Sequence, residues 1–103
     1  MRRLLINAPA RYDLEAIDTY LRFEKCNTQA ADHFVEAVRV AYDAVYDNPM
    51  AFRLCPDRYL ASNGYRSIGI MRYIMIYRYD ENADEVHIIR FFHELQDYAN
   101  QLS

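Results

Sequence analysis

A histidine stands at a structural boundary in the stretch "VHIIRFFHELQDY", residues 86–98. The residues before His93 are rich in isoleucine and phenylalanine, as in a strand, and those after it are typical of a short amphipathic helix. At such a joint an imidazole can serve as a general acid or base. It can equally hydrogen-bond the backbone or cap the following helix, and we favour this structural role.

Eleven of the twelve cationic residues are arginines, whose planar fork suits phosphates and carboxylates. Arg66 can hold a phosphate or contact a target, but an arginine at the start of an inner strand more often pairs with a carboxylate, here Asp97 or an acid of a partner. Arg90 alternates with Ile89 and is either exposed or paired with an acidic partner. The residues that we expect to contact a target or partner are Arg66, Arg72, Tyr73, Arg90 and His93.

Three tyrosines share one side of the period-two stretch "RYIMIYRYD", residues 72–80. Tyr73, Tyr77 and Tyr79 could stack the bases of a nucleic acid. Because no lysine surrounds them and the net charge is −3, we instead assign them to the core and to a protein interface.

Composition places the chain among ordinary globular proteins, with 52% hydrophobic and 26% charged residues. We expect one domain, residues 1–103, and the net charge of −3 argues against a basic nucleic-acid binder. Cys26 and Cys55 are too few and too far apart for a zinc site, and we expect no metal or cofactor. No apolar run is long enough to span a bilayer and no signal peptide opens the chain, so we expect a cytoplasmic protein without a membrane partner.

Hydrophobic periodicity predicts an α+β fold in the order β-α-α-β-β-β-α. A helical hairpin should pack on one face of a small, mostly antiparallel sheet, and the first strand must pair with an element distant in sequence. The loop at 50–63 should pack through Phe52, Leu54 and Leu60. The predicted strands are residues 2–8, 65–71, 72–80 and 85–92, and the predicted helices are 10–25, 28–47 and 93–102.

With these residues in this order, the chain resembles the RelE/ParE superfamily of toxins from bacterial type II toxin–antitoxin modules. The resemblance covers nearly the whole chain and is carried by "APARYDLEAIDTYL", "QAADHFVEAVRVAYDAVYDNP", "GYRSIGIMRYIMIYRYDE" and "VHIIRFFHELQDY". It implies a RelE/ParE-like domain and a cognate antitoxin whose extended and helical segments wrap the toxin. RelE-like members cleave messenger RNA in the ribosomal decoding site, whereas ParE-like members poison DNA gyrase.

Cleavage of RNA by its ribose 2′-hydroxyl needs a base, a proton donor and cations around the phosphorane. RelE-like enzymes resemble one another in an arginine within the second sheet strand, where this chain has Gly69 at or next to the position, and in basic or tyrosine residues after the last strand, where it has Glu94 and Asp97. If the protein is a nuclease, its catalytic candidates are Arg66, His93 and Tyr98. A cluster of arginines beside His93 on one concave face would favour that reading, and the arginines in question are Arg53, Arg58, Arg66 and Arg72.

We therefore expect a ParE-like toxin that inhibits growth through protein–protein contact, with gyrase as its target and without sequence-specific nucleic-acid binding of its own. Its antitoxin would add a strand or lay an amphipathic helix along the apolar groove beside the helical hairpin. Because ParE-like toxins are typically basic and this chain is not, capture by an acidic antitoxin should be weaker, and apolar burial should supply most of the affinity. Two alternatives stay open: a ribosome-dependent messenger RNA endonuclease, and a degenerate module that no longer poisons a target.

Overall fold

The structure is a computed structural model that describes residues 1–102, and it confirms the α+β class. Its elements follow the predicted order, with a π-helical turn (η1) and a short helix (α3) in addition. In chain order they are β1 (Arg3–Ile6), α1 (Ala8–Thr19), η1 (Tyr20–Glu24), α2 (Thr28–Asp47), α3 (Arg58–Ser62), β2 (Tyr65–Ile70), β3 (Tyr73–Asp80), β4 (Glu85–His93) and α4 (Tyr98–Leu102).

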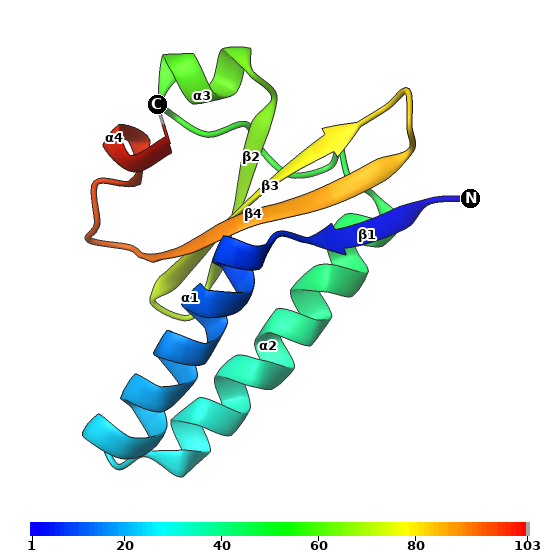
Figure 1. Ribbon diagram of the computed structural model, residues 1–103. Coiled ribbons are helices and arrows are strands. Elements are labelled where there is room, and N and C mark those ends of the chain that lie inside the picture. The colour runs from blue at the N-terminus through cyan, green and yellow to red at the C-terminus, as the bar shows by residue number, and fades with distance from the viewer. Residues whose placement is uncertain (103) are drawn as a thin grey trace.

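The four strands form one mixed sheet in the order β1–β4–β3–β2 (Figure 1). Strands β2, β3 and β4 make an antiparallel meander, whereas β1 lies parallel to β4 with Leu4 opposite Val86 and Ile6 opposite Ile88. The predicted pairing of the first strand with a distant element is therefore confirmed. A parallel pair needs a long crossover, and the whole helical hairpin and meander provide it.

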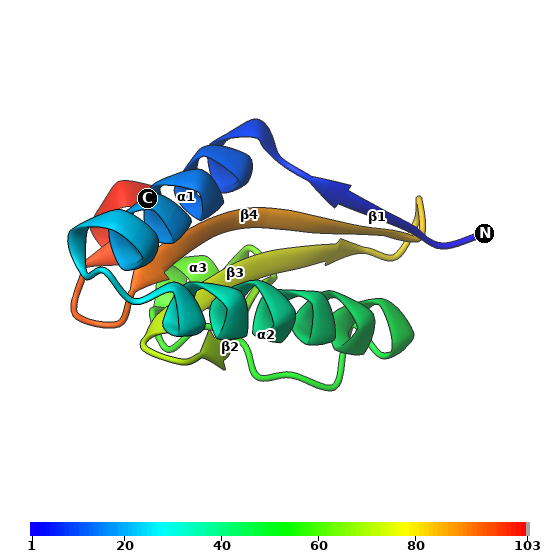
Figure 2. The ribbon, with the colours of Figure 1, turned by 90° about the horizontal axis from the view of Figure 1, so that it is seen from below.

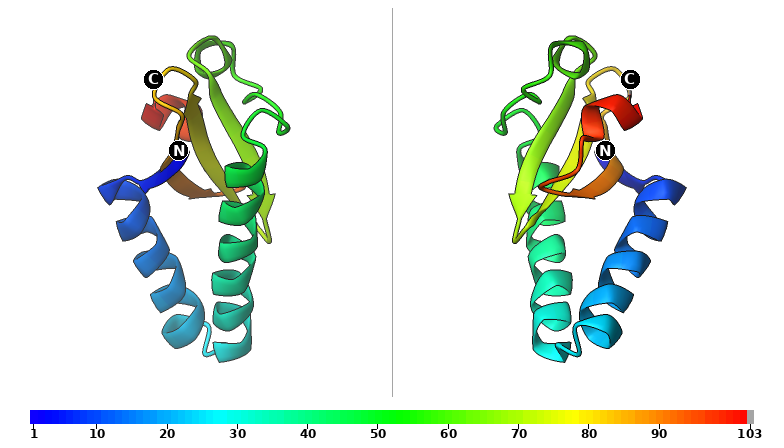
Figure 3. Two further views of the ribbon diagram at one scale, coloured as in Figure 1. Left: turned by 90° about the vertical axis from the view of Figure 1, so that its right-hand side faces the viewer. Right: turned by 90° about the vertical axis from the view of Figure 1, so that its left-hand side faces the viewer.

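The helical hairpin, formed by α1, η1 and α2 (residues 8–47), covers one face of the sheet (Figure 2). Asn27 caps α2, since its side-chain oxygen accepts a hydrogen bond from the Ala30 amide at 3.0 Å; the sequence had left this position open between Asn27 and Thr28. The two helices lie close at their connecting turn and separate toward their other ends (Figure 3). The apolar stripe of α2 fills the space against the sheet with Ala31, Phe34, Val38, Ala41 and Val45.

Both faces of β3 are buried, and they contribute to two different apolar clusters. Met75 and Tyr77 face the hairpin, and Ile76 faces a smaller cluster under α3 and α4. This is the alternation that the period-two pattern predicts. Tyr77 also donates a hydrogen bond to the Pro49 carbonyl at 2.8 Å, and burial raises its pKa to about 12.

The segment 50–63 is not the irregular loop that we expected. Asp57 caps α3 by accepting a hydrogen bond from the Leu60 amide at 3.0 Å, and Leu60 is fully buried. Phe52 packs edge-on against Tyr77, but Leu54 is 42% exposed, so the prediction for Leu54 was wrong. Leu54 instead uses its backbone, in an isolated bridge to Arg66 at the sheet edge.

The last helix is shorter than predicted, because β4 extends to His93 and α4 begins only at Tyr98. The amide of Glu94 donates to the Arg72 carbonyl at 2.9 Å, and the amide of Gln96 donates to the His93 carbonyl at 2.9 Å. These bonds form a turn in place of the first helical turn. Tyr98, Ala99 and Leu102 then pack α4 against the smaller cluster.

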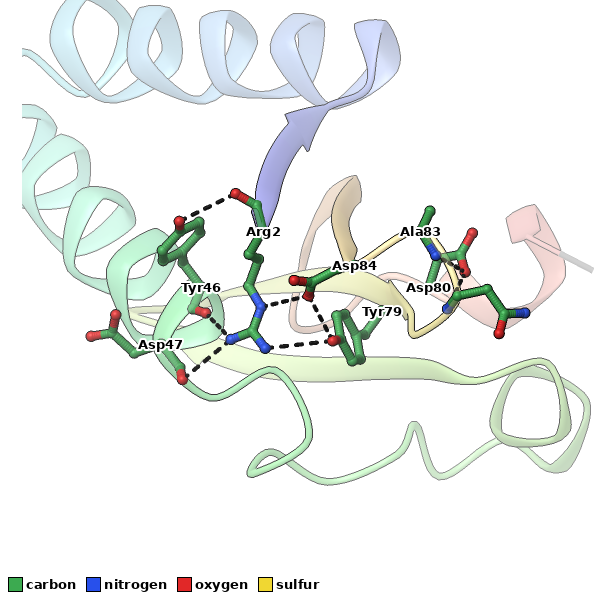
Figure 4. A network of polar contacts seen from close by, with 8 residues as sticks. Arg2, Tyr46, Asp47, Tyr79, Asp80, Ala83 and Asp84 are labelled. Carbon is green, nitrogen blue, oxygen red and sulfur yellow. Dashed lines mark hydrogen bonds and ion pairs between the residues drawn. The ribbon is translucent and has the colours of Figure 1, made fainter.

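Arg2 ties the start of the chain to two other elements (Figure 4). Its guanidinium donates to the Tyr46 carbonyl at the end of α2 (2.7 Å) and to the Asp84 carboxylate in the β3–β4 turn (2.9 Å). Tyr79 donates to the same carboxylate at 2.8 Å, and these hydrogen bonds lower the pKa of Asp84. The positive charge of Arg2 lies at the C-terminal end of α2, where it interacts favourably with the helix dipole.

Asp13 of α1 provides hydrogen-bond acceptors for the part of β4 that extends beyond its pairing with β1. Its Oδ2 accepts a hydrogen bond from the Phe91 amide at 2.9 Å, and the carboxylate pairs with the Arg90 guanidinium through bonds of 2.7 and 3.1 Å. A bulge places an extra residue, Ile89, between the residues opposite Ile76 and Tyr77. The bulge shifts the alternation of β4, so the amide of Phe91 points toward α1.

Replacing Asp13 by alanine should lower the free energy of unfolding by about 2–3 kcal/mol, because a buried amide and a half-buried guanidinium lose their acceptor together. Urea denaturation of the purified protein would measure the change. The matched control is Asp43→Ala, which removes an exposed partner of Arg39 and should leave stability close to that of the original chain. Equal losses in the two variants would contradict the edge role of Asp13.

Candidate functional site

A hollow of about 460 Å³ lies beside His93, where three parts of the chain meet. The end of the hairpin's first arm, the β2–β3 turn and the last residue of β4 contribute to it. We call it the His93 hollow, and it is lined by Tyr20, Leu21, Lys25, Met71, Arg72, Tyr73 and His93. The backbone is unusual on two sides of it, with a π-helical turn at 20–24 and a positive φ of 57° at Met71.

The imidazole of His93 is held in one orientation by its own turn. Its Nδ1 accepts a hydrogen bond from the Leu95 amide at 3.1 Å, and its ring lies edge-on to Tyr73 with the centroids 5.4 Å apart. The backbone bond that we expected for this residue is therefore present, but His93 does not cap α4. An acceptor at Nδ1 leaves the proton of the neutral ring on Nε2.

Two cations border the hollow. Arg72 is exposed and lies 3.4 Å from the Glu94 carboxylate, and the Lys25 ammonium lies 5.7 Å from the centroid of the Tyr20 ring. Arg72 is the one member of the four singled-out arginines that lines the hollow. Lys25 was missed by sequence reasoning, although it is the only lysine and ends the first arm of the hairpin.

The structure does not bring together the three residues named as catalytic candidates. Arg66 donates to the Phe52 carbonyl at the outer edge of β2 instead of pairing with Asp97, and its alternative pairing with an acid of a partner stays a prediction. Tyr98 stacks on Phe92 at 5.8 Å, within the cluster on the opposite face of the sheet from the hairpin. His93 is therefore alone in the hollow among Arg66, His93 and Tyr98.

Two further residues from the sequence analysis are engaged inside the protein. Arg90 has its acidic partner in Asp13 of the same chain. Tyr73 is 9% exposed and packs on Phe34 as well as on His93. Burial raises the pKa of Tyr73, so its phenol stays protonated at neutral pH.

The side chains that line the hollow are better placed to donate hydrogen bonds than to act as a general base. The Nε2–H of His93, the guanidinium of Arg72 and the ammonium of Lys25 all donate. The remaining His93 nitrogen already accepts from Leu95, and Tyr73 keeps its proton. Such a set can bind an anion or a carbonyl group, but it lacks the converging guanidinium groups that a phosphorane needs.

A second surface lies between α1 and α2 and is almost wholly apolar. This hairpin groove has a volume of about 340 Å³. The Tyr42 hydroxyl is buried beside it without a hydrogen-bond partner among the described residues, and burial raises its pKa to about 12. The groove is lined by Leu14, Phe34, Val35, Val38, Arg39 and Tyr42.

A third surface follows the outer edge of β2. Backbone bonds from Cys55 to the Tyr65 carbonyl and from Ser67 to the Arg53 carbonyl cover the first half of this edge. By alternation, the amide and carbonyl of Gly69 also point outward. A hollow of about 310 Å³ runs along this part of the strand, between α2 and residues 68–71.

The described residues contain no group of histidine, cysteine, aspartate or glutamate side chains that could hold a metal ion. Over the same part of the chain, none of the helices has the length and apolar character needed to cross a membrane.

Comparison with known proteins finds relatives over nearly the whole chain. A family model described as "ParE toxin of type II toxin-antitoxin system, parDE" matches residues 4–98. The chain is similar in fold to the solved toxin–antitoxin complex RelBE2 from Mycobacterium tuberculosis, with 19% identity and a TM-score of 0.60, covering 89% of this chain and 96% of that one. It is also similar to the chromosomal ParDE system from P. aeruginosa, with 24% identity and a TM-score of 0.61, covering 90% and 96%. No curated protein sequence matches the chain.

When its ring is neutral, His93 should exist as the Nε2–H tautomer, because its Nδ1 accepts a hydrogen bond from the Leu95 amide. Multiple-bond ¹H–¹⁵N spectra, recorded above the titration range of ordinary histidines, distinguish the two ring nitrogens. His33, which is exposed on α2, serves as the internal comparison. A proton found on Nδ1 of His93 would show that the turn after β4 is arranged differently.

Proposed function

The chain belongs to the ParE toxin family of type II toxin–antitoxin systems, and on that premise we propose that it inhibits growth by gripping another protein, with DNA gyrase as the target. The observation that carries this proposal is the dispersal of the arginines. Arg53 precedes α3, Arg58 lies within it, Arg66 is bound to a backbone carbonyl, and only Arg72 reaches the His93 hollow. A nuclease would need several of them around one phosphate.

The exposed apolar side chains support a function through protein contact. Tyr20 is 40% exposed and Met71 51%, and both line the His93 hollow; Phe23, which is 69% exposed, lies in the same π-helical turn as Tyr20. Exposed apolar side chains mark an interaction surface where they lie together in one patch, as they do here, and not where they are scattered singly. We place the contact with the target at this end of the molecule, around the His93 hollow.

Antitoxin binding is the second part of the proposal. The hairpin groove is suited to the apolar face of a helix, and the outward-facing backbone of Gly69 is suited to an added strand. Both surfaces lie along α2, so one extended partner can use them in succession. The similar solved structures are themselves toxin–antitoxin systems.

The second candidate function is cleavage of messenger RNA on the ribosome. One observation favours it: Lys25, Arg72 and His93 share one hollow, so two cations and a titratable ring can meet a single phosphate. In that case the catalytic candidates beside His93 are Arg72 and Lys25, instead of the Arg66 and Tyr98 named in the sequence analysis. The pairing of Arg72 with Glu94 weakens this candidate.

Expression of the chain alone should arrest growth with gyrase-linked DNA breaks and intact messages. Profiles of DNA supercoiling and breakage, taken together with transcript ends in the same cells, would test this. Message cuts in phase with codons would instead support the endonuclease, and the absence of any arrest would support a degenerate module.

The variant His93→Ala separates these functions further. If His93 only orders the turn after β4, the variant should stay within about threefold of the original toxicity, because Tyr20, Met71 and Arg72 still present the rest of the hollow to the target. A folded His93→Ala protein that had lost its toxicity would mean that the imidazole itself contacts the target or takes part in chemistry, and transcript ends from cells that express the original chain would separate these two explanations. The matched control is His33→Ala on the exposed face of α2, and circular dichroism would verify that both variants fold.

A further inference from the structure

The negative charge of the protein is concentrated in the helical hairpin. Residues 8–47 hold eight acidic and four cationic side chains, a net charge of −4, whereas the rest of the chain holds seven acidic and eight cationic side chains, a net charge of +1. The overall net charge of −3 therefore describes one part of the molecule and not its whole surface. A partner that lies on the hairpin meets a field of opposite sign from one that lies on the sheet edge.

Two clusters of the same composition border the hairpin groove. On α2, Arg39 is shared between Glu36 at 2.7 Å and Asp43 at 3.0 Å. This cluster holds one arginine between two carboxylates and therefore has a net charge of −1, as does the second cluster. Among the described residues Arg39 is the only cation that lines the groove, and it is already paired with Glu36 and Asp43.

The second cluster lies toward the turn of the hairpin. Arg22 is shared between Asp18 at 2.9 Å and Asp32 at 3.2 Å, which links α1 to α2. Asp18 is one helical turn beyond Leu14, and Asp32 is three residues before Val35, so both carboxylates lie on the groove's side of their helices. Asp32, Glu36 and Asp43 are each more than 60% exposed and are open to a partner.

We propose that the hairpin groove binds an amphipathic helix whose apolar stripe is flanked by lysine or arginine, and that this helix belongs to the antitoxin. The inference rests on the proposed function for the identity of the partner. An acidic helix would set its carboxylates against Glu36 and Asp43, which have no free cation beside them. A helix is expected rather than a strand, because the walls of the groove are helices whose backbone groups are already bonded.

The length of the groove sets the size of the helix. The lining residues of α2 run from Phe34 to Tyr42, eight residue-to-residue steps or about 12 Å along the helix axis. An apolar stripe of about three leucines, at spacings of three and four, matches this length. The basic residues of the helix then fall in two places: along the side that faces Glu36 and Asp43, and at the end near the hairpin turn, opposite Asp18 and Asp32.

Two designed, helix-stabilised peptides of about 14 residues would test the inference. They share one leucine stripe and differ only in their flanks, which are lysine in one and glutamate in the other. The lysine peptide should bind the full chain about tenfold more tightly at low salt. The difference should shrink in about 1 M salt, where charges are screened within about 3 Å.

Variants of the protein locate the effect. In Glu36→Lys/Asp43→Lys the preference should reverse, because the rim becomes positive while both positions stay exposed. The control Glu81→Lys/Asp97→Lys makes the same change of net charge outside the hairpin and should preserve the preference for lysine flanks. Heteronuclear spectra should place the shifted resonances on Val35 and Tyr42.

Each other outcome overturns the inference. Tighter binding of the glutamate peptide, or equal binding of the two, would reject the basic flanks. Reversal in the control variant would show that net charge and not the rim decides, and failure of both peptides to bind would reject the groove as a docking surface. None of these results depends on toxicity, whereas the growth experiment tests the proposed function without regard to the groove.

Discussion

The architecture depends on how the backbone amides and carbonyls of β4 are hydrogen-bonded on the side that faces away from β3. This strand runs for nine residues from Glu85 to His93, whereas β1 has only four with which to pair it. Asp13 supplies what β1 does not, by accepting the Phe91 amide and holding the Arg90 guanidinium. The contact fixes α1 against the strand, and the position of α1 in turn fixes the hairpin turn beside His93. An unpaired amide at this edge would otherwise cost about as much as a lost hydrogen bond.

The three surfaces that can bind a partner lie at different places on the protein and differ in their chemistry. The His93 hollow gathers donors from three segments but only two cations, one of which is paired with Glu94. The hairpin groove is apolar and is bordered by surplus carboxylates, and the outer edge of β2 offers backbone groups at Gly69. A toxin that must bind both an antitoxin and a target can use such separate surfaces in combination. The division follows from topology, since α2 borders both the hairpin groove and the edge of β2.

The sequence predicted the fold well because its signals are local. The apolar stripe of α2 and the alternation of β3 each come from residues within a few positions of one another. Prediction failed where a local signal was overridden or overlooked. The cap at Asp57 starts a helix that we had taken as a loop, and the amide of Glu94 bonds to Arg72 across the meander and thereby delays α4 to Tyr98.

By itself, then, the sequence determined the order of the elements, the buried face of each one and the membership of a superfamily. Only the tertiary structure decided which charged groups from distant segments meet. Asp13 lies 77 residues from Arg90 in the sequence, and Lys25 at the end of the first helical arm lines the same hollow as Arg72 and His93. These encounters depend on strand register and on a single bulge at Ile89, and a shift of one residue would send every side chain beyond it to the other face. Periodicity records what each segment buries, but it contains no information about which distant partner the exposed face will find.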